Sequence, residues 1–173
     1  GGYGYFDNMN AFYEGNGFTV YDRLSIPKEK IFCESIWGVA DEILFDKVLE
    51  TMDAHAAKHE PALEVVMTTS NHRPFIFPAG RVQAKQGGRE GGVRYTDWAI
   101  QNFLEKASKK PWFQNTVFVI VADHQASAAG KMALPVNKYH IPCIIYAPGL
   151  VPAGVNDRLI SQMDLAPTLL GIL

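Results

Sequence analysis

The sequence predicts an α/β fold with a mainly parallel central sheet. Three apolar runs have the length of strands: residues 62–69, 117–122 and 140–147. Segments with apolar side chains at helical spacing alternate with them, a pattern typical of βαβ units. Residues 117–122 (VFVIVA) contain no polar side chain. An uninterrupted apolar run of this length indicates a strand that is covered on both faces.

The helical pattern is clearest in the segment where Ile43, Leu44, Val48 and Leu49 recur at intervals of three and four. By the same criterion we expect four helices, over residues 6–14, 36–55, 94–109 and 161–173. The last begins with Ser161 and has Asp164 three residues later, the spacing of an N-terminal capping box.

A further short strand and a loop are expected outside these segments. Residues 18–21 form a short apolar run that could be a strand. Residues 83–93 are polar and contain four glycines, which predicts a loop.

The composition limits the class of protein. A chain of 173 residues with 47% apolar and 20% charged side chains can build one domain with a sizeable core. The net charge of −2 gives no support to nucleic-acid binding, so we expect no nucleic-acid partner. Cys33 and Cys143 form no CxxC motif, and Cys143 lies in an apolar run where we expect it to be buried. No apolar stretch approaches the roughly 20 residues that span a bilayer.

Polar side chains with the chemistry of a site lie at the ends of the predicted strands. Asp123 and His124 follow residues 117–122, Asn71 and His72 follow residues 62–69, and His140 begins the third run. Ligands of α/β sheets gather at the carboxyl ends of strands, and carboxylate and imidazole groups both bind divalent metals.

Each of these residues also has a structural interpretation. A lone histidine after a strand is more often a surface or hydrogen-bonded residue, and this is the favoured interpretation of His72 taken alone. His140 could equally bind to the neighbouring loop. For Asp123 and His124 we favour a functional role, because burying an acid without a partner is costly.

Five segments taken together resemble one known family. They are TTSNHRPF (68–75), VADH (121–124), WGVADEILFDKVLE (37–50), AGKMALPVNKYHIPCIIYAPG (129–149) and SQMDLAPTLLGIL (161–173). Taken in their order along the chain and at these separations, they are similar to the sulfatase-like phosphoglycerol transferases of the alkaline phosphatase superfamily, which include lipoteichoic acid synthase. The resemblance implies a three-layer α/β sandwich with a mixed, mainly parallel central sheet. Residues 1–173 would be the C-terminal part of a single sulfatase-like catalytic domain, truncated at the N-terminus.

The resemblance also assigns roles to individual residues. It implies that Asp123 and His124 bind a divalent metal ion, usually Mn²⁺ or Mg²⁺, with Ca²⁺ and Zn²⁺ left open. His72 would contact the substrate phosphate. Asn71, Lys131 and His140 are further candidates for substrate binding, although Lys131 could equally be a solvated loop residue. The family's Ser or Thr nucleophile would lie upstream of Gly1, so this chain alone is expected to be inactive.

The implied reaction transfers phosphoglycerol from a glycerophosphate diester, a lipid headgroup, to a glycan or polyol acceptor. The full-length protein would be anchored in a bacterial cell membrane through segments outside this sequence, with its catalytic domain in the periplasm or outside the cell. An unpaired sheet edge would also favour self-association of the truncated chain. One departure concerns residues 6–9 (FDNM), where lipoteichoic acid synthase has a substrate-contacting Trp-x-Arg that this chain lacks.

Two alternatives stay open at this point. The first is hydrolysis of a sulfate ester, which needs a Cys or Ser in a Cys-x-Pro-x-Arg context; Cys33 is followed by Glu34, Ser35 and Ile36 and does not match it. The second is a sulfatase-like domain that has no catalytic activity.

Overall fold

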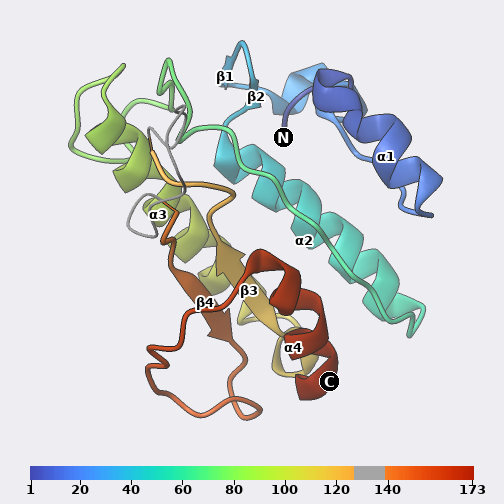
Figure 1. The fold of residues 1–173 in the computed structure, drawn as a ribbon. Coiled ribbons are helices and arrows are strands. Elements are labelled where there is room, and N and C mark those ends of the chain that lie inside the picture. The colour runs from blue at the N-terminus through green and yellow to red at the C-terminus, as the bar shows by residue number, and fades with distance from the viewer. Residues whose placement is uncertain (127–138) are drawn as a thin grey trace. The chain divides into compact units, whose positions relative to one another are not determined.

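The computed structural model describes residues 1–126 and 139–173, which form two compact units (Figure 1). Unit 1 is Gly1–Trp112 and unit 2 is Phe113–Leu173. Among the described residues, no helix is both long enough and apolar enough to cross a membrane.

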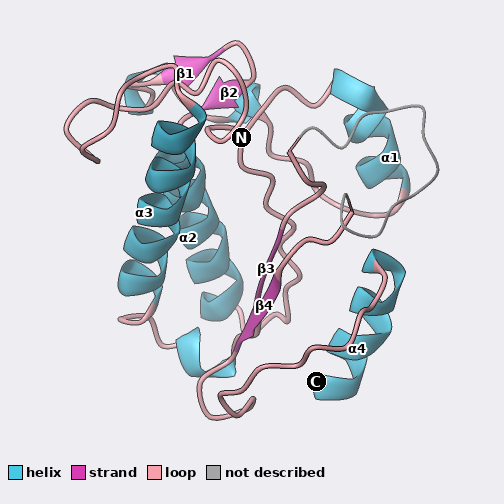
Figure 2. Ribbon diagram, turned by 60° about the vertical axis from the view of Figure 1, so that its left-hand side comes forward, coloured by secondary structure: helices cyan, strands magenta, loops and turns pink. Residues whose placement is uncertain are grey.

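Unit 1 is built on two long helices, α2 (Asp41–Ala57) and α3 (Arg89–Ala107), which lie side by side in both ribbon views (Figures 1 and 2). Phe45 of α2 stacks on Phe103 of α3 with ring centroids 4.9 Å apart. The remaining elements of the unit are η1 (Phe6–Asn8), α1 (Met9–Gly15), η2 (Arg23–Ser25), η3 (Lys28–Lys30), β1 (Glu34–Ser35) and β2 (Gly38–Val39), the last two paired antiparallel. One cluster of buried hydrophobic residues consists of Ile26, Val39, Ala40, Ile43, Leu44, Phe45, Phe77, Tyr95 and Ala99.

The start of α2 is fixed by groups from distant parts of the chain. The N-cap residue, Ala40, has no side chain that could accept a hydrogen bond. The amide of Asp41 donates instead to Ser70 Oγ (3.1 Å), and the amide of Glu42 donates to the Tyr95 hydroxyl (3.3 Å). These contacts satisfy two of the four amides that a helix leaves unpaired at its N-terminus. The helix therefore begins at residue 41 and not at 36.

Helix α3 begins five residues earlier than expected, and the prediction of a loop throughout residues 83–93 is wrong for its last part. The reason is close packing. A Cβ added at Gly91 would lie 2.7 Å from Lys85 O, and one at Gly92 would lie 2.9 Å from Phe75 Cδ1. Glycine normally weakens a helix, but here it lets the first turns of α3 approach the chain that precedes it.

Unit 2 contains η4 (Phe113–Asn115), β3 (Phe118–Val121), β4 (Cys143–Tyr146), η6 (Gln162–Asp164) and α4 (Leu165–Ile172). Strands β3 and β4 are antiparallel, with Phe118 opposite Tyr146 and Val121 opposite Cys143. The predicted capping box is confirmed: Ser161 Oγ accepts from the Met163 amide at 3.2 Å, and Asp164 Oδ2 accepts from the Ser161 amide at 2.7 Å.

Several expectations about strands differ from the structure. Residues 62–69 and 18–21 are not strands, because they share no ladder of hydrogen bonds with another described segment. Cys143 is exposed and not buried, because β4 is exposed on both faces among the described residues, as Ile144 and Tyr146 also show. The two sheets among those residues are each two-stranded and antiparallel. The helices and strands are those of an α/β protein, while the three-layer, mainly parallel sheet stays a prediction.

Candidate functional site

The Asp123–His124 pair lies in unit 2, directly after β3. Gln162 of η6 fixes the backbone at this point, because its Nε2 donates to the carbonyls of Ala122 (3.1 Å) and Asp123 (3.0 Å). The turn that carries the pair is therefore held by a residue about 40 positions away in the sequence.

The side chains of the pair face each other. Asp123 Oδ1 accepts from the amide of His124 at 2.8 Å, and Asp123 Oδ2 lies 3.5 Å from His124 Nε2. His124 Nδ1 lies 2.9 Å from the carbonyl oxygen of Gln125. Because a carbonyl can only accept, Nδ1 carries the proton, and Nε2 keeps its lone pair when the ring is neutral.

This arrangement fits a metal ligand pair. Histidines that bind metals usually donate their other ring N–H to a carbonyl or carboxylate, as His124 does to Gln125. With ligand distances of about 2.0–2.2 Å, two donors on one ion lie roughly 3–3.5 Å apart, which matches the Oδ2–Nε2 separation. Both side chains are accessible, with 78% of Asp123 and 65% of His124 exposed. Within residues 1–126 and 139–173, no group of three or more His, Cys, Asp or Glu side chains could hold a metal.

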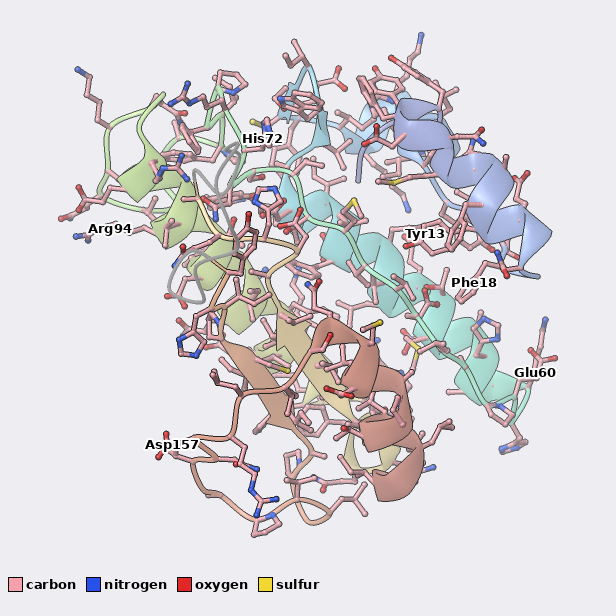
Figure 3. The ribbon with its side chains drawn as sticks, in the orientation of Figure 1. Tyr13, Phe18, Glu60, His72, Arg94 and Asp157 are labelled. Atoms are coloured by element: carbon pink, nitrogen blue, oxygen red, sulfur yellow. The ribbon has the colours of Figure 1, made fainter. Side chains whose placement is uncertain are left out.

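His72 lies in unit 1, in a turn that closes with a bond of 2.7 Å from the Phe75 amide to the His72 carbonyl. His72 is among the side chains labelled in Figure 3. Its Nδ1 lies 2.9 Å from the carbonyl of Arg73, and the same carbonyl accepts from Trp37 Nε1 at 2.5 Å. The edge of the imidazole meets the Trp37 ring, with centroids 4.4 Å apart and an interplanar angle of 62°. These contacts orient the ring and leave the side chain exposed.

A buried carboxylate supports the segment that leads to His72. Asp41 is 0% exposed, and its Oδ1 accepts from the amides of Thr69 and Ser70, both at 3.0 Å. Its Oδ2 accepts from Thr96 Oγ1 of α3 at 2.8 Å. Sequence reasoning missed this role for Asp41 and the contact between Trp37 and His72. The signal that could have found them is the segment WGVADE, which holds Trp37 and Asp41.

A second polar group joins α2 to α3. Arg81 binds both carboxylate oxygens of Glu42, through Nε and Nη2 at 3.0 Å each, and the Tyr95 hydroxyl donates to Glu42 Oε1 at 3.2 Å. Burial raises the pKa of Tyr95 well above its usual value, so the phenol stays a neutral donor. Nothing in the local sequence indicated this group.

A sequence model described as Sulfatase matches residues 1–173, the whole chain. The chain belongs to the sulfatase family. A crystal structure of a protein in the alkaline phosphatase superfamily from Vibrio parahaemolyticus is 33% identical and superposes with a TM-score of 0.91 over 99% of this chain. The lipoteichoic acid synthase LtaP from Listeria monocytogenes, 21% identical, has a similar fold, with a TM-score of 0.73 over 88% of the chain.

Curated relatives of this sulfatase-family chain include two kinds of protein. The uncharacterized sulfatase YdeN of Escherichia coli (strain K12) is 24% identical over 98% of the chain. Phosphoglycerol transferase I of Xanthomonas campestris pv. campestris (strain B100) is 24% identical over 97% of it. The chain spans 33% and 26% of the lengths of these two relatives, and 42% and 43% of the two solved chains. The resemblance inferred from the motifs is confirmed.

The structure brings some of the predicted site residues together. Asp123 and His124 face each other, and Asn71 and His72 are neighbours in one exposed turn. The backbone carbonyl of His140 accepts from Gln125 Nε2 at 3.4 Å, so the main chain of His140 lies beside the residue that follows the pair. Lys131 lies outside the described residues. His72 belongs to unit 1 and the pair to unit 2, so their approach to a common substrate stays a prediction.

Proposed function

We propose that this chain is the C-terminal part of a divalent-metal-dependent catalytic domain that transfers phosphoglycerol from a glycerophosphate diester to a glycan or polyol acceptor. The observation that carries the proposal is the contact between Asp123 Oδ2 and His124 Nε2, with the other ring nitrogen held by the Gln125 carbonyl. The likeness to phosphoglycerol transferase I supports the choice of substrate. The coverage of less than half of each solved relative supports a domain larger than residues 1–173.

In this mechanism Asp123 and His124 hold the metal ion, for which Mn²⁺ and Mg²⁺ are the first candidates. The bound ion would neutralise charge on the phosphate and lower the pKa of a hydroxyl nucleophile. His72 presents Nε2 to the phosphate, because Nδ1 is engaged by the Arg73 carbonyl; when the ring is protonated, Nε2 donates to a non-bridging oxygen. The nucleophile is a Ser or Thr hydroxyl outside residues 1–173.

The donor is a lipid headgroup, so the full-length protein works at the cell envelope. We propose that it is anchored in a bacterial cell membrane, with the catalytic domain on the outer side or in the periplasm. Lipoteichoic acid synthase LtaP, which shares the fold, is the source of this expectation.

Metal binding tests the observation on which the proposal rests. Asp123→Asn should weaken the affinity for Mn²⁺, measured by calorimetry, by at least about tenfold, because it replaces a charged ligand with a neutral amide. Asp157→Asn is the matched control: it makes the same change at an exposed aspartate of the same unit, which Figure 3 labels, and should leave the affinity within about twofold. Equal affinities for wild type and Asp123→Asn would contradict the assignment.

A second candidate function is hydrolysis of a sulfate ester, which the family description and the likeness to YdeN favour. A phosphodiester and a sulfate monoester both present one negative charge on a tetrahedral centre, so the geometry of His72 accommodates either. Turnover by the full-length protein decides between them. We expect faster cleavage of a glycerophosphate diester than of an aryl sulfate, and His72→Ala should slow it by roughly 10²–10³-fold.

Faster cleavage of the aryl sulfate than of the glycerophosphate diester would establish the sulfatase alternative. A domain without catalytic activity would show unchanged turnover and metal content for Asp123→Ala. The chain of residues 1–173 alone should turn over neither ester, even with Mn²⁺ present, because the proposed nucleophile lies outside it.

A further inference from the structure

We propose that a pocket beside His72, lined by Arg73 and Arg89, binds a second anionic group of the substrate: a phosphate, a sulfate or a carboxylate. The pocket has a volume of about 620 Å³ and is lined by Arg73, Pro74, Phe75, Gly87 and Arg89. The proposal deepens the proposed function and rests on it, because it takes His72 as the contact for the ester that reacts.

The charge of the pocket is the first argument. Two guanidinium groups line it, and no acidic residue does. The nearest acid in the sequence, Glu90, is engaged elsewhere, because its Oε1 lies 2.8 Å from Nη2 of Arg94. Among the described residues, no carboxylate lies within 4.0 Å of the guanidinium of Arg73 or Arg89. Both side chains are exposed, so their charges are available to a ligand.

Three of the four other arginines pair their guanidinium with a carboxylate, and Arg158 has no such ion pair among the described residues. Arg23 binds Glu34, Arg81 binds Glu42, and Arg94 binds Glu90. The two pocket arginines lack such a partner within the described part of the chain, and they converge on one concave surface.

The floor of the pocket is fixed in place. Phe75 is held on one side by α3, where a Cβ at Gly92 would lie 2.9 Å from its Cδ1. On the other side its carbonyl accepts from the Gly87 amide at 3.3 Å. Phe75 has a φ of 57°, a conformation that bulky side chains rarely adopt and that persists only where the surrounding structure enforces it.

The Phe75 ring also orients one of the two charges. The Arg89 guanidinium lies over this ring, 5.4 Å from its centroid, so the aromatic face attracts the cation. The pocket thus combines the apolar ring of Phe75 with one cation that this ring orients, Arg89, and a second exposed cation, Arg73.

The position of the pocket and its chemistry define the class of ligand. Guanidinium groups bind phosphate, sulfate and carboxylate through paired N–H donors. Arg73 directly follows His72, and the Arg73 carbonyl accepts from the imidazole, so the pocket adjoins the proposed ester site. A substrate with two anionic groups could place one at His72 and the other between the arginines. That second group could belong to the donor or to the acceptor.

Binding of two synthetic probes tests the proposal. Propane-1,3-bisphosphate carries two phosphates, and glycerol 3-phosphate carries one. The wild-type protein should bind the bisphosphate at least about tenfold more tightly, because its second phosphate adds charge-assisted hydrogen bonds to the two guanidinium groups. Arg73→Gln combined with Arg89→Gln should remove this preference. Arg94→Gln removes the same charge from a paired arginine of α3, which Figure 3 labels, and should preserve the preference within about twofold.

The variants separate this proposal from the proposed function. An unchanged preference in the double variant overturns the pocket, even if His72→Ala weakens both probes. Loss of the preference in the double variant supports the pocket, even if His72→Ala has no effect on glycerol 3-phosphate, a result that would count against the role of His72. Arg89→Lys should retain part of the preference, because the charge remains but the paired donors do not.

Turnover by the full-length protein identifies the source of the second anion. If the double variant raises KM for the donor alone, the anion belongs to the donor; if it raises KM for the acceptor alone, it belongs to the acceptor. An unchanged KM for both substrates would overturn the proposal.

Discussion

Replacing Asp41 with alanine should destabilise unit 1 more than any other single change considered for this chain. The carboxylate is fully buried and accepts three hydrogen bonds: from the amides of Thr69 and Ser70 and from the hydroxyl of Thr96. Alanine cannot accept any of them. The hydroxyl of Thr96 can rotate toward another acceptor, whereas the two amides are fixed by the backbone.

The magnitude follows from these three donors. A buried donor without a partner costs about 1–3 kcal/mol, and Ser70 is buried while Thr69 is half-buried, so water can reach the Thr69 amide more easily. The loss of a negative charge in the first turn of α2 adds about 0.3–1 kcal/mol. Together these terms predict a loss of about 3–5 kcal/mol in the free energy of unfolding.

Urea denaturation followed by tryptophan fluorescence suits this test. All three tryptophans, Trp37, Trp98 and Trp112, belong to unit 1, so the signal reports the unfolding of that unit. The midpoint should fall while the slope with urea stays constant.

Thr96→Val is the matched control. It removes one of the three donors and should cost about 1.5 kcal/mol, the lower end for a hydrogen bond to a charged group. A loss below 1 kcal/mol for Asp41→Ala, or equal losses for the two variants, would refute the reasoning.

Three further outcomes test other parts of the molecule. Tyr95→Phe should lower stability by about 1–2 kcal/mol in urea, because Glu42 loses the buried hydroxyl; no change would show that the hydrogen bond adds nothing. The hydrogen bond from Lys110 lowers the pKa of Asp53 below its ordinary value of 3.8. This hydrogen bond therefore stabilises the folded protein above pH 3.8, and its contribution is lost as the pH falls through the lower, folded-state pKa of Asp53. Lys110→Met should therefore reduce the loss of stability as the pH falls below about 4 in urea titrations; an unchanged acid profile would count against this. Exposed Cys143 should react with a thiol reagent before half-buried Cys33, whose pKa burial raises; equal rates would disprove it.

Features that depend on neighbours in the sequence were predicted well. The capping box of Ser161 and Asp164 spans three residues and was confirmed as expected. The contact between Asp123 and His124 also follows from adjacency, and the structure shows it. The apolar faces of α2 and α3 were visible because helical spacing repeats within a few residues. In each case the interacting residues lie within a few positions of each other, so the sequence pattern alone is enough to predict the feature.

Features that depend on distant parts of the chain were missed. Residues 62–69 have the composition of a buried strand, but composition does not specify a partner strand, and none pairs with them among the described residues. The role of Asp41 depends on Thr69, 28 positions away, and Thr96, 55 positions away. The start of α3 depends on Gly91 and Gly92 meeting another segment, and a glycine pair in a sequence equally indicates a loop.

The two candidate histidines make the same local backbone contact, although different chemistry is proposed for each. In both, Nδ1 meets the backbone carbonyl of the next residue: His72 that of Arg73, and His124 that of Gln125. In both rings, Nε2 is therefore the nitrogen that is not bound to this carbonyl. A metal ligand needs the lone pair of that nitrogen, which protonation removes, whereas a hydrogen bond to an anionic ester needs the proton. The same hydrogen bond to the backbone thus leaves Nε2 for the proposed metal ion at His124 and for the proposed ester at His72.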